Sequence, residues 1–318
     1  MLVFIAGATG AVGRRLIPLL VSAGHSVVGL THTPAKAGMI TAFGAKAVVA
    51  DGLDERAIGE AVASSEPDVV VHEMTDLKDA SDLRHFDRAF ASSNRLRTEG
   101  TDILMTAARD AGVKRFVAQS FCGWPYARVD GPIKSEADPL DPDPPRELRH
   151  SLDAIEHLEQ VVTHASGPEG IVLRYGAFYG TDTGLFDGPM IDQIRARRAP
   201  LIGDGEGWWS FLHIDDAAAA TAAAIERGRA GSVYNIVDDE PAPAREWLPA
   251  LARMLGAKPP FHVPPWIARI LAGEHIVMMM TQNRAGSNAK AKRELGWQPA
   301  HASWRDGFAE IVRQRHAA

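Results

Sequence analysis

The 318-residue sequence lacks features that would assign it to several large classes of protein. It has one cysteine, Cys122, so no disulfide can form within the chain, and a cytoplasmic location is the simpler expectation. No stretch approaches the ~20 apolar residues that a membrane-spanning helix needs. The formal net charge of −6 and the pI near 6.1 give no basic surface for nucleic acid or an anionic membrane. These absences favour a small-molecule partner.

Short runs rich in β-branched residues alternate with helical patterns through the first half of the chain. The first run has no positively charged leader before it and no cleavage-site pattern, so we expect a strand there and not a signal peptide. The runs are almost continuously apolar, as in a parallel sheet covered on both faces. The expected strands are residues 2–7, 26–31, 46–51, 68–73, 115–120 and 170–176, and helices are expected at 13–25, 93–112 and 149–162. This alternation predicts an α/β fold with a doubly wound parallel sheet of the Rossmann type.

The pattern becomes irregular after about residue 176. We expect residues 1–176 to form a nucleotide-binding Rossmann domain, to which about 209–238 return, and residues 177–318 to form mostly a small C-terminal substrate-binding lobe. Residues 131–145 contain five prolines and are not expected to form regular structure, so they are expected to form a lid, a binding loop or a disordered segment. The apolar run at 276–280 is expected in the core or in the lining of an apolar pocket.

The sequence GATGAVG follows the first expected strand and opens the first expected helix. Glycine permits a sharp turn and a close approach of the backbone to a ligand, and the helix N-terminus favours a diphosphate. We therefore predict a dinucleotide site, whereas a tight turn without a ligand is the alternative. The predicted binding residues in this turn are Gly7, Thr9, Gly10, Ala11, Val12 and Gly13.

The end of the second strand favours NADP over NAD. An acidic residue there would bind the adenosine ribose of NAD, but the sequence LTHTPAK has none. His32 and Lys36 suit a 2′-phosphate better, so NADP is the predicted cofactor and NAD the alternative. Both side chains could also be simply solvated. Asp51 and Gly52 follow the third strand, where the adenine edge is expected.

Together these motifs resemble the extended short-chain dehydrogenase/reductase superfamily, in its NAD-dependent epimerase/dehydratase-like branch. The resemblance runs through nearly the whole chain. Beyond GATGAVG it is carried by TEGTDILMTAARDAGVKRFV, LRYGAFYG, FLHIDDAAAA and AKRELGWQP, at residues 98–117, 173–180, 211–220 and 291–299. It implies a Rossmann domain for a nicotinamide cofactor and a C-terminal lobe for the substrate.

One part of that family's pattern is missing. The resemblance implies a Tyr-x-x-x-Lys pair on one helix, in which the tyrosine passes a proton and the lysine lowers its pKa. None of the four tyrosines here has a lysine four residues on. Aligning EQVV with the family places Ser151 and Ile155 at the two positions, and another register places Leu148 and Leu152 there. Neither pair can pass a proton, so we expect helix 149–162 to be structural.

The loop after the fifth strand, SFCGWPYAR, supplies the candidate replacements. Ser120 lies at or one residue before the family's Ser/Thr position, and Tyr126 is the only tyrosine on the loop, so both are predicted catalytic residues. The alternative is that Trp124 and Tyr126 form an aromatic wall for an apolar ligand. Trp124, Arg174 and Tyr179 are predicted to contact the substrate. No metal site is expected, because no group of ligand residues has suitable spacing.

These observations predict an atypical NAD(P)-dependent oxidoreductase or isomerase acting on a small, partly apolar carbonyl or alkene-type substrate. Two other functions stay open: a non-catalytic NAD(P)-binding sensor, which the missing Tyr–Lys pair favours, and a nucleotide-sugar epimerase or dehydratase. A small molecule is the expected partner, nucleic acid and membrane are not, and a homodimer is compatible with the sequence.

Overall fold

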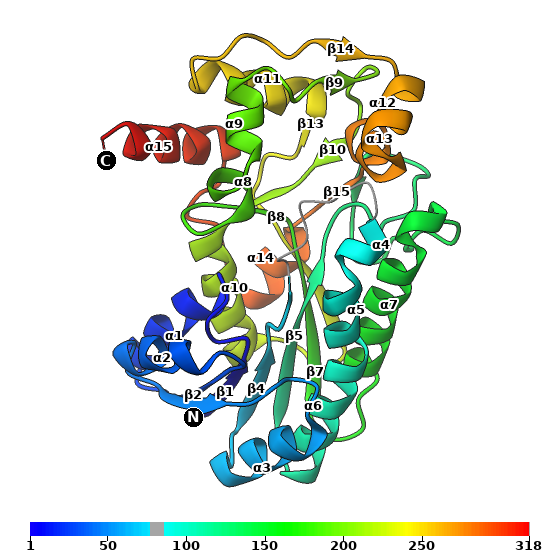
Figure 1. Cartoon of the computed structure of the whole chain (residues 1–318). Helices are drawn as coiled ribbons and strands as arrows, with labels where there is room; N and C mark the ends of the chain where they lie inside the picture. The colour runs from blue at the N-terminus through cyan, green and yellow to red at the C-terminus, as the bar shows by residue number, and fades with distance from the viewer. Residues whose placement is uncertain (77–85, 318) are drawn as a thin grey trace.

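A parallel sheet forms the centre of the N-terminal lobe (Figure 1). The structure is a computed structural model that describes residues 1–76 and 86–317. Within these residues the sheet has seven strands in the order β12-β7-β5-β4-β1-β2-β3, all parallel, which confirms the predicted fold class. The strands are β1 Leu2–Ala6, β2 Ser26–Thr31, β3 Lys46–Val49, β4 Val69–His72, β5 Arg115–Phe121, β7 Glu169–Tyr175 and β12 Ser232–Ile236.

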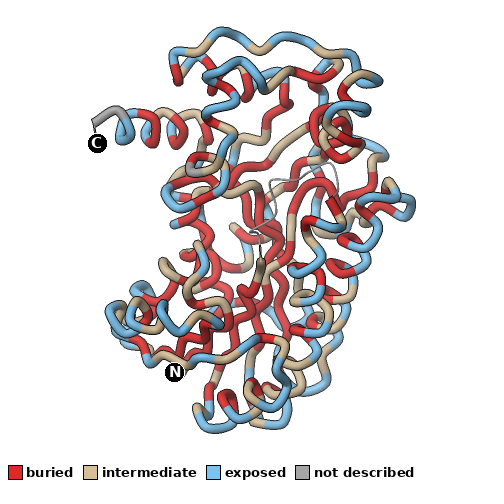
Figure 2. The backbone as a smooth tube through the Cα atoms, in the orientation of Figure 1, coloured by how far each residue is buried: buried red, intermediate tan, exposed pale blue. Residues whose placement is uncertain are grey.

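Helices cover both faces of this sheet, so its inner strands are buried on both sides, whereas the edge strand β3 is partly exposed (Figures 1 and 2). Val3 and Ile5 of β1 enter the core beneath α1 and α10, whereas Phe4 and Ala6 enter the core beneath α3, α6 and α7. Alternate residues of a strand face opposite ways, so a strand covered on both sides is apolar throughout. The covering helices are α1 Gly13–Ser22, α2 Ala37–Ala42, α10 Ile214–Arg227 and α14 Ala289–Leu295 on one side, and α3 Glu55–Ser65, α5 Ala91–Arg97, α6 Glu99–Asp110 and α7 Arg149–Thr163 on the other.

The single helix predicted at 93–112 is two helices, α5 and α6. Thr98 separates them with φ −93° and ψ −85°, outside the helical region. Its hydroxyl donates to the Asn94 carbonyl at 3.0 Å, which offers the backbone an alternative to continuing the helix. The helix predicted at 149–162 is confirmed as α7.

The C-terminal lobe has its own apolar core, around Trp247, Trp304 and Phe308. The run at 276–280 belongs to α13, and Met278–Met280 are buried. In the Pro-rich stretch 131–145, β6 Ile133–Lys134 is a short strand that the sequence did not predict; it pairs with β15 Ala285–Gly286. The lobe contains α8 Gly184–Asp187, α9 Met190–Arg195, α11 Ala244–Met254, α12 Pro265–Ala272, α13 Glu274–Thr281 and α15 Trp304–Ala317, with the short strands β8 Ala177–Tyr179, β9 Leu201–Ile202, β10 Trp208–Trp209, β11 Phe211–His213, β13 Ala242–Pro243 and β14 His262–Val263. The domain boundary at 176/177 stays a prediction.

Strand β12 lies at one edge of the sheet, and two charged side chains contact its outer side. The Asn235 backbone N–H donates to the Glu136 carboxylate at 2.7 Å. The Lys290 ammonium donates to the Val233 carbonyl at 2.9 Å. Across residues 1–76 and 86–317, none of the helices combines the length and apolar character needed to cross a bilayer.

Candidate cofactor and substrate site

A cavity of about 510 Å³ lies at the carboxyl ends of the first four strands. Such crevices at the ends of parallel strands are where open α/β sheets bind ligands. Seven of the predicted cofactor residues line it: Gly7, Thr9, Gly10, His32, Lys36, Asp51 and Gly52. Ala11, Val12 and Gly13 continue the chain from the cavity into α1, where Val12 and Gly13 are buried. Their roles in binding stay predictions.

The glycine turn is as tight as the motif requires. Gly7 has φ +96°, and a Cβ atom there would lie 2.5 Å from the Glu73 carbonyl oxygen. The Gly10 N–H donates to the Gly7 carbonyl at 2.9 Å, and a Cβ on Gly13 would lie 2.6 Å from that same oxygen. The turn therefore brings the N-terminus of α1 to the cavity, an arrangement that fits the diphosphate of a dinucleotide.

The ends of β2 and β3 form the outer wall of the cavity. His32 and Lys36 are exposed, whereas the buried Thr31 hydroxyl accepts from the Thr33 N–H at 3.2 Å. The Asp51 carboxylate accepts from the Leu53 N–H at 3.0 Å, which holds the turn after β3. No carboxylate from β2 faces the cavity among the described residues.

The sequence analysis missed three charged residues that line this cavity: Arg95 on α5, and Glu73 and Asp76 after β4. Arg95 pairs with Glu99 at 2.7 Å on the same helix. Nothing in the sequence marked α5 as part of a site, because its pattern is that of a packing helix. Glu73 follows an apolar strand, where an acidic residue was a detectable exception to the pattern.

At the ends of β5 and β7, two of the predicted site residues bond to the same carboxylate. Ser120 and Arg174 are partners in the register of the two strands, and both reach Glu159 of α7. Arg174 donates from Nε and Nη2 to the two Glu159 oxygens at 2.7 and 2.5 Å, and Ser120 donates to Oε1 at 2.7 Å. All three side chains are buried. Arg174 and Glu159 therefore form an internal ion pair, and Ser120 is a third partner of the same carboxylate. The polar groups in these bonds are not free to bind a ligand.

Tyr126 extends the same network. Its side chain is 1% exposed, and its hydroxyl donates to Asn235 Oδ1 at 2.7 Å and accepts from Arg174 Nη1 at 2.9 Å. Burial raises the pKa of this phenol well above its ordinary value. The structure thus places Tyr126 between two fixed partners. Trp124 instead lies in an apolar cluster, edge-on to Phe86.

The two positions of the family's Tyr–Lys pair hold no proton relay. The Ser151 hydroxyl donates to Asp87 Oδ1 at 2.8 Å and accepts from Asn94 Nδ2 at 2.9 Å, so its one hydrogen is already used. Ile155 packs in the apolar cluster with Trp124. In the alternative register, Leu148 and Leu152 belong to that same cluster.

Tyr179 lies in the core of the C-terminal lobe. Its side chain is 0% exposed, and its ring packs edge-on against Phe308 at 5.2 Å. A Cβ on Gly307 would lie 2.4 Å from the Tyr179 ring. The surroundings in the structure are those of a packed aromatic side chain, and its contact with a substrate stays a prediction.

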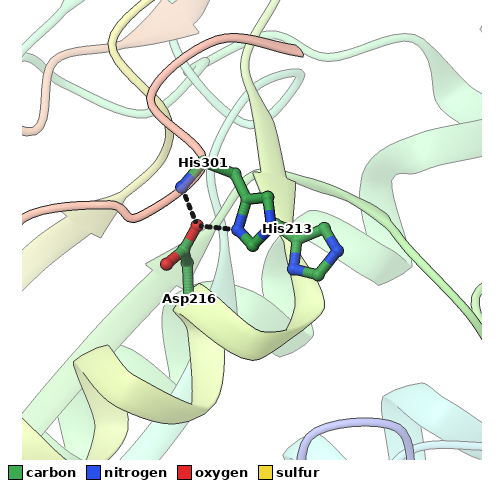
Figure 3. Close-up of side chains that lie close together, drawn as sticks. All are labelled: His213, Asp216 and His301. Carbon is green, nitrogen blue, oxygen red and sulfur yellow. Dashed lines mark hydrogen bonds and ion pairs between the residues drawn. The ribbon is translucent and has the colours of Figure 1, made fainter. Parts of the chain in front are cut away.

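Three potential metal ligands that are far apart in the sequence meet near the start of α10 (Figure 3). Asp216 accepts from the N–H and Nδ1 of His301, at 2.9 and 3.0 Å, and from the Ala300 N–H at 2.8 Å. The rings of His213 and His301 stack with centroids 3.7 Å apart and planes 21° apart. A metal must lie near the plane of each imidazole that binds it, and stacked rings do not share such a point. The cluster connects α10 to the C-terminal segment, and spacing alone could not have revealed it.

Comparisons with known proteins agree with this architecture. The sequence is 42% identical over 310 residues to a 3-diazoavenalumate denitrifying reductase from a Streptomyces species, covering 97% of this chain and 99% of that protein. The structure resembles a dTDP-glucose 4,6-dehydratase from Streptomyces venezuelae solved with NAD, with a TM-score of 0.78 and 22% identity, covering 100% of this chain and 97% of that one. It also resembles a human epimerase family protein solved with NADPH, with a TM-score of 0.76 and 19% identity, covering 98% and 99%.

The family match is the most direct result. Residues 3–237 match the NAD dependent epimerase/dehydratase family, and this range contains the glycine turn and all of the seven-stranded sheet except Leu2 of β1. Relatives and structural neighbours are named as reductases, dehydratases and epimerases, and the neighbours above contain NAD or NADPH, which supports a nicotinamide cofactor for this fold. The chain therefore belongs to the NAD-dependent epimerase/dehydratase family.

Proposed function

We propose that this chain is an NADP-dependent reductase that delivers a hydride to a small aromatic diazo compound and releases its nitrogen. The observation that carries the proposal is the replacement of the family's proton relay by Ser151 and Ile155, in a fold that keeps the cofactor turn. The name of the 42% identical relative, a denitrifying reductase of 3-diazoavenalumate, supports the substrate class.

The chemistry explains why the relay is dispensable. A bound nicotinamide supplies a hydride, and with it an arenediazonium becomes an arene and N₂: one C–H bond forms, the C–N bond breaks with its electrons on nitrogen, and no proton is taken up. Reduction of a carbonyl or an alkene, the substrate class predicted from the sequence, consumes a proton as well. A site whose relay positions hold Ser151 and Ile155 suits the first reaction better.

The chain's own residues would supply binding and exclusion of water. Trp124 and Phe86 meet edge-on, with ring centroids 5.6 Å apart, and form with Met278 part of an apolar cluster beside α7. The three side chains are buried, and we place the flat aromatic ring of the substrate against this cluster. His32 and Lys36 would contact the 2′-phosphate of NADP, since β2 ends without a carboxylate.

Isotope labelling tests the proposal. The protein is incubated with NADPH and a substituted benzenediazonium salt, and N₂, arene and NADP are measured against a protein-free control. We expect one deuterium in the arene from NADPH deuterated at C4 and none from D₂O. Turnover no faster than the control would contradict the proposal. Solvent deuterium on a product carbon, with an activated alkene as substrate, would instead support the proton-consuming reaction.

A further inference from the structure

Glu73 is a buried carboxyl group at the edge of the cofactor cavity. It follows β4 directly, it is 5% exposed, and it is one of the residues that line the cavity. Its backbone carbonyl lies so close to Gly7 that a Cβ on Gly7 would lie 2.5 Å from that oxygen. One carboxyl oxygen, Oε2, is buried and has no hydrogen-bond partner. A buried carboxylate in this state would be costly.

The hydrogen bonds around Glu73 indicate where its proton is. Glu73 Oε1 lies 2.9 Å from the Tyr175 hydroxyl, which lies 2.7 Å from Thr221 Oγ1, and Thr221 donates to the Ala217 carbonyl at 2.8 Å. If Glu73 is ionised, Tyr175 donates to it, and the single Thr221 hydrogen must serve two acceptors. If Glu73 is protonated, three hydrogens serve three bonds: Glu73 to Tyr175, Tyr175 to Thr221, and Thr221 to Ala217.

We propose that Glu73 is a positioning residue for the nicotinamide cofactor, and that the chain binds this cofactor with Glu73 protonated. The neutral carboxyl group completes the chain of hydrogen bonds to α10 and keeps a negative charge away from the diphosphate expected at the Gly7 turn. Deprotonation would break that chain and place like charges together. The inference rests on cofactor binding and is independent of the substrate.

Two observations support this protonation state independently of the hydrogen count. Burial raises the pKa of Glu73 to about 8, against the contact with Tyr175, which lowers it. The neighbouring His72 stays neutral, because burial lowers its pKa to about 4; its Nδ1 accepts from the Met74 N–H at 3.3 Å. The charged and titratable groups that face Glu73 or share the cavity are Tyr175 on β7, His72 and Asp76 from the β4 segment, His32 and Lys36 after β2, Asp51 after β3, and Arg95 on α5.

The sign of the expected pH dependence follows from linkage. Since binding requires the proton, cofactor affinity is full below the pKa of Glu73 and falls above it, by about tenfold per pH unit. NADPH is titrated by fluorescence between about pH 6.5 and 9.5 in the wild-type chain, Glu73→Gln and Glu60→Gln. Glu60 is exposed on α3, so Glu60→Gln makes the same chemical change outside the cavity. We expect the rise in Kd above about pH 8 in the wild type and in Glu60→Gln, and a flat profile in Glu73→Gln.

A rise that persists in Glu73→Gln, or a flat wild-type profile, would overturn the proposal. Calorimetry of the wild-type chain keeps the test valid if the variant does not fold. At about pH 9, in buffers of different ionisation enthalpy, binding of NADPH should take up close to one proton. Zero uptake would overturn the role of Glu73 whether or not the diazo reduction occurs.

Discussion

The two ends of the candidate site both contain polar side chains, but at one end these line a cavity and at the other they bond to one another. At the ends of β1–β4 the polar side chains leave a cavity of about 510 Å³ that can accept a dinucleotide. At the ends of β5, β7 and β12, Ser120, Arg174 and Asn235 occupy one line across the sheet and belong to one internal network. A polar residue at the end of a strand therefore marks a ligand site only when its neighbours do not already satisfy it.

The largest expected effect on stability comes from a substitution in the internal network at the ends of β5 and β7. Glu159→Ala leaves the buried Arg174 guanidinium without its carboxylate, and removing one partner of a buried pair costs about 3–5 kcal/mol. Urea unfolding measures this loss. Glu156→Ala, on the exposed side of the same helix, is the matched control and should change stability by about 0.5 kcal/mol or less. Equal losses in the two variants would contradict the structural role of the pair.

A smaller and more selective effect, on cofactor affinity, is expected from a substitution in the cofactor cavity. Lys36→Ala removes a cation that we place against the 2′-phosphate, and a hydrogen bond to a charged group contributes about 1.5–3 kcal/mol. NADPH should therefore bind roughly 10- to 100-fold more weakly, with NADH affinity nearly unchanged. Fluorescence titration with both cofactors measures the ratio, and Lys46→Ala, at an exposed lysine of β3, is the control. Equal weakening for both cofactors would remove the argument for NADP.

The smallest effect is expected at Tyr126. Tyr126→Phe keeps the ring but leaves Arg174 Nη1 and Asn235 Oδ1 without this partner, at a cost of about 1–2 kcal/mol in stability. Turnover of the folded variant should stay within about twofold of the wild type, because the proposed hydride reduction needs no acid. A large loss of turnover at unchanged stability would restore Tyr126 as the proton donor predicted from the sequence.

In the cofactor cavity, the glycine turn and the ends of β2 and β3 were predictable from the sequence because their signals are local. Apolar runs of β-branched residues locate the strands, and the glycines at 7, 10 and 13 locate the turn, since few other residues tolerate φ +96° at Gly7. His32 and Lys36 follow from their place after β2. These properties belong to single short segments, so no knowledge of the tertiary contacts was needed.

The internal network at the ends of β5, β7 and β12 was not predictable in the same way, because it depends on side chains that meet across the fold. Arg174 and Glu159 are on different elements, and Asn235 approaches Tyr126 only when β12 joins β7. The sequence suggested that Arg174 and Tyr126 contact a ligand, whereas in the structure they bond to Glu159 and Asn235. The stack of His213 on His301 was missed for the same reason.

The charged side chains on the outer edge of β12 have a consequence for the whole molecule. An edge strand with free N–H and C=O groups can pair with a strand of another chain. Here Glu136 bonds to one backbone N–H of the edge and Lys290 bonds to one backbone carbonyl, so neither group is free to pair with another chain. The two side chains protect the protein against edge-to-edge aggregation, a hazard that grows with its concentration in the cell.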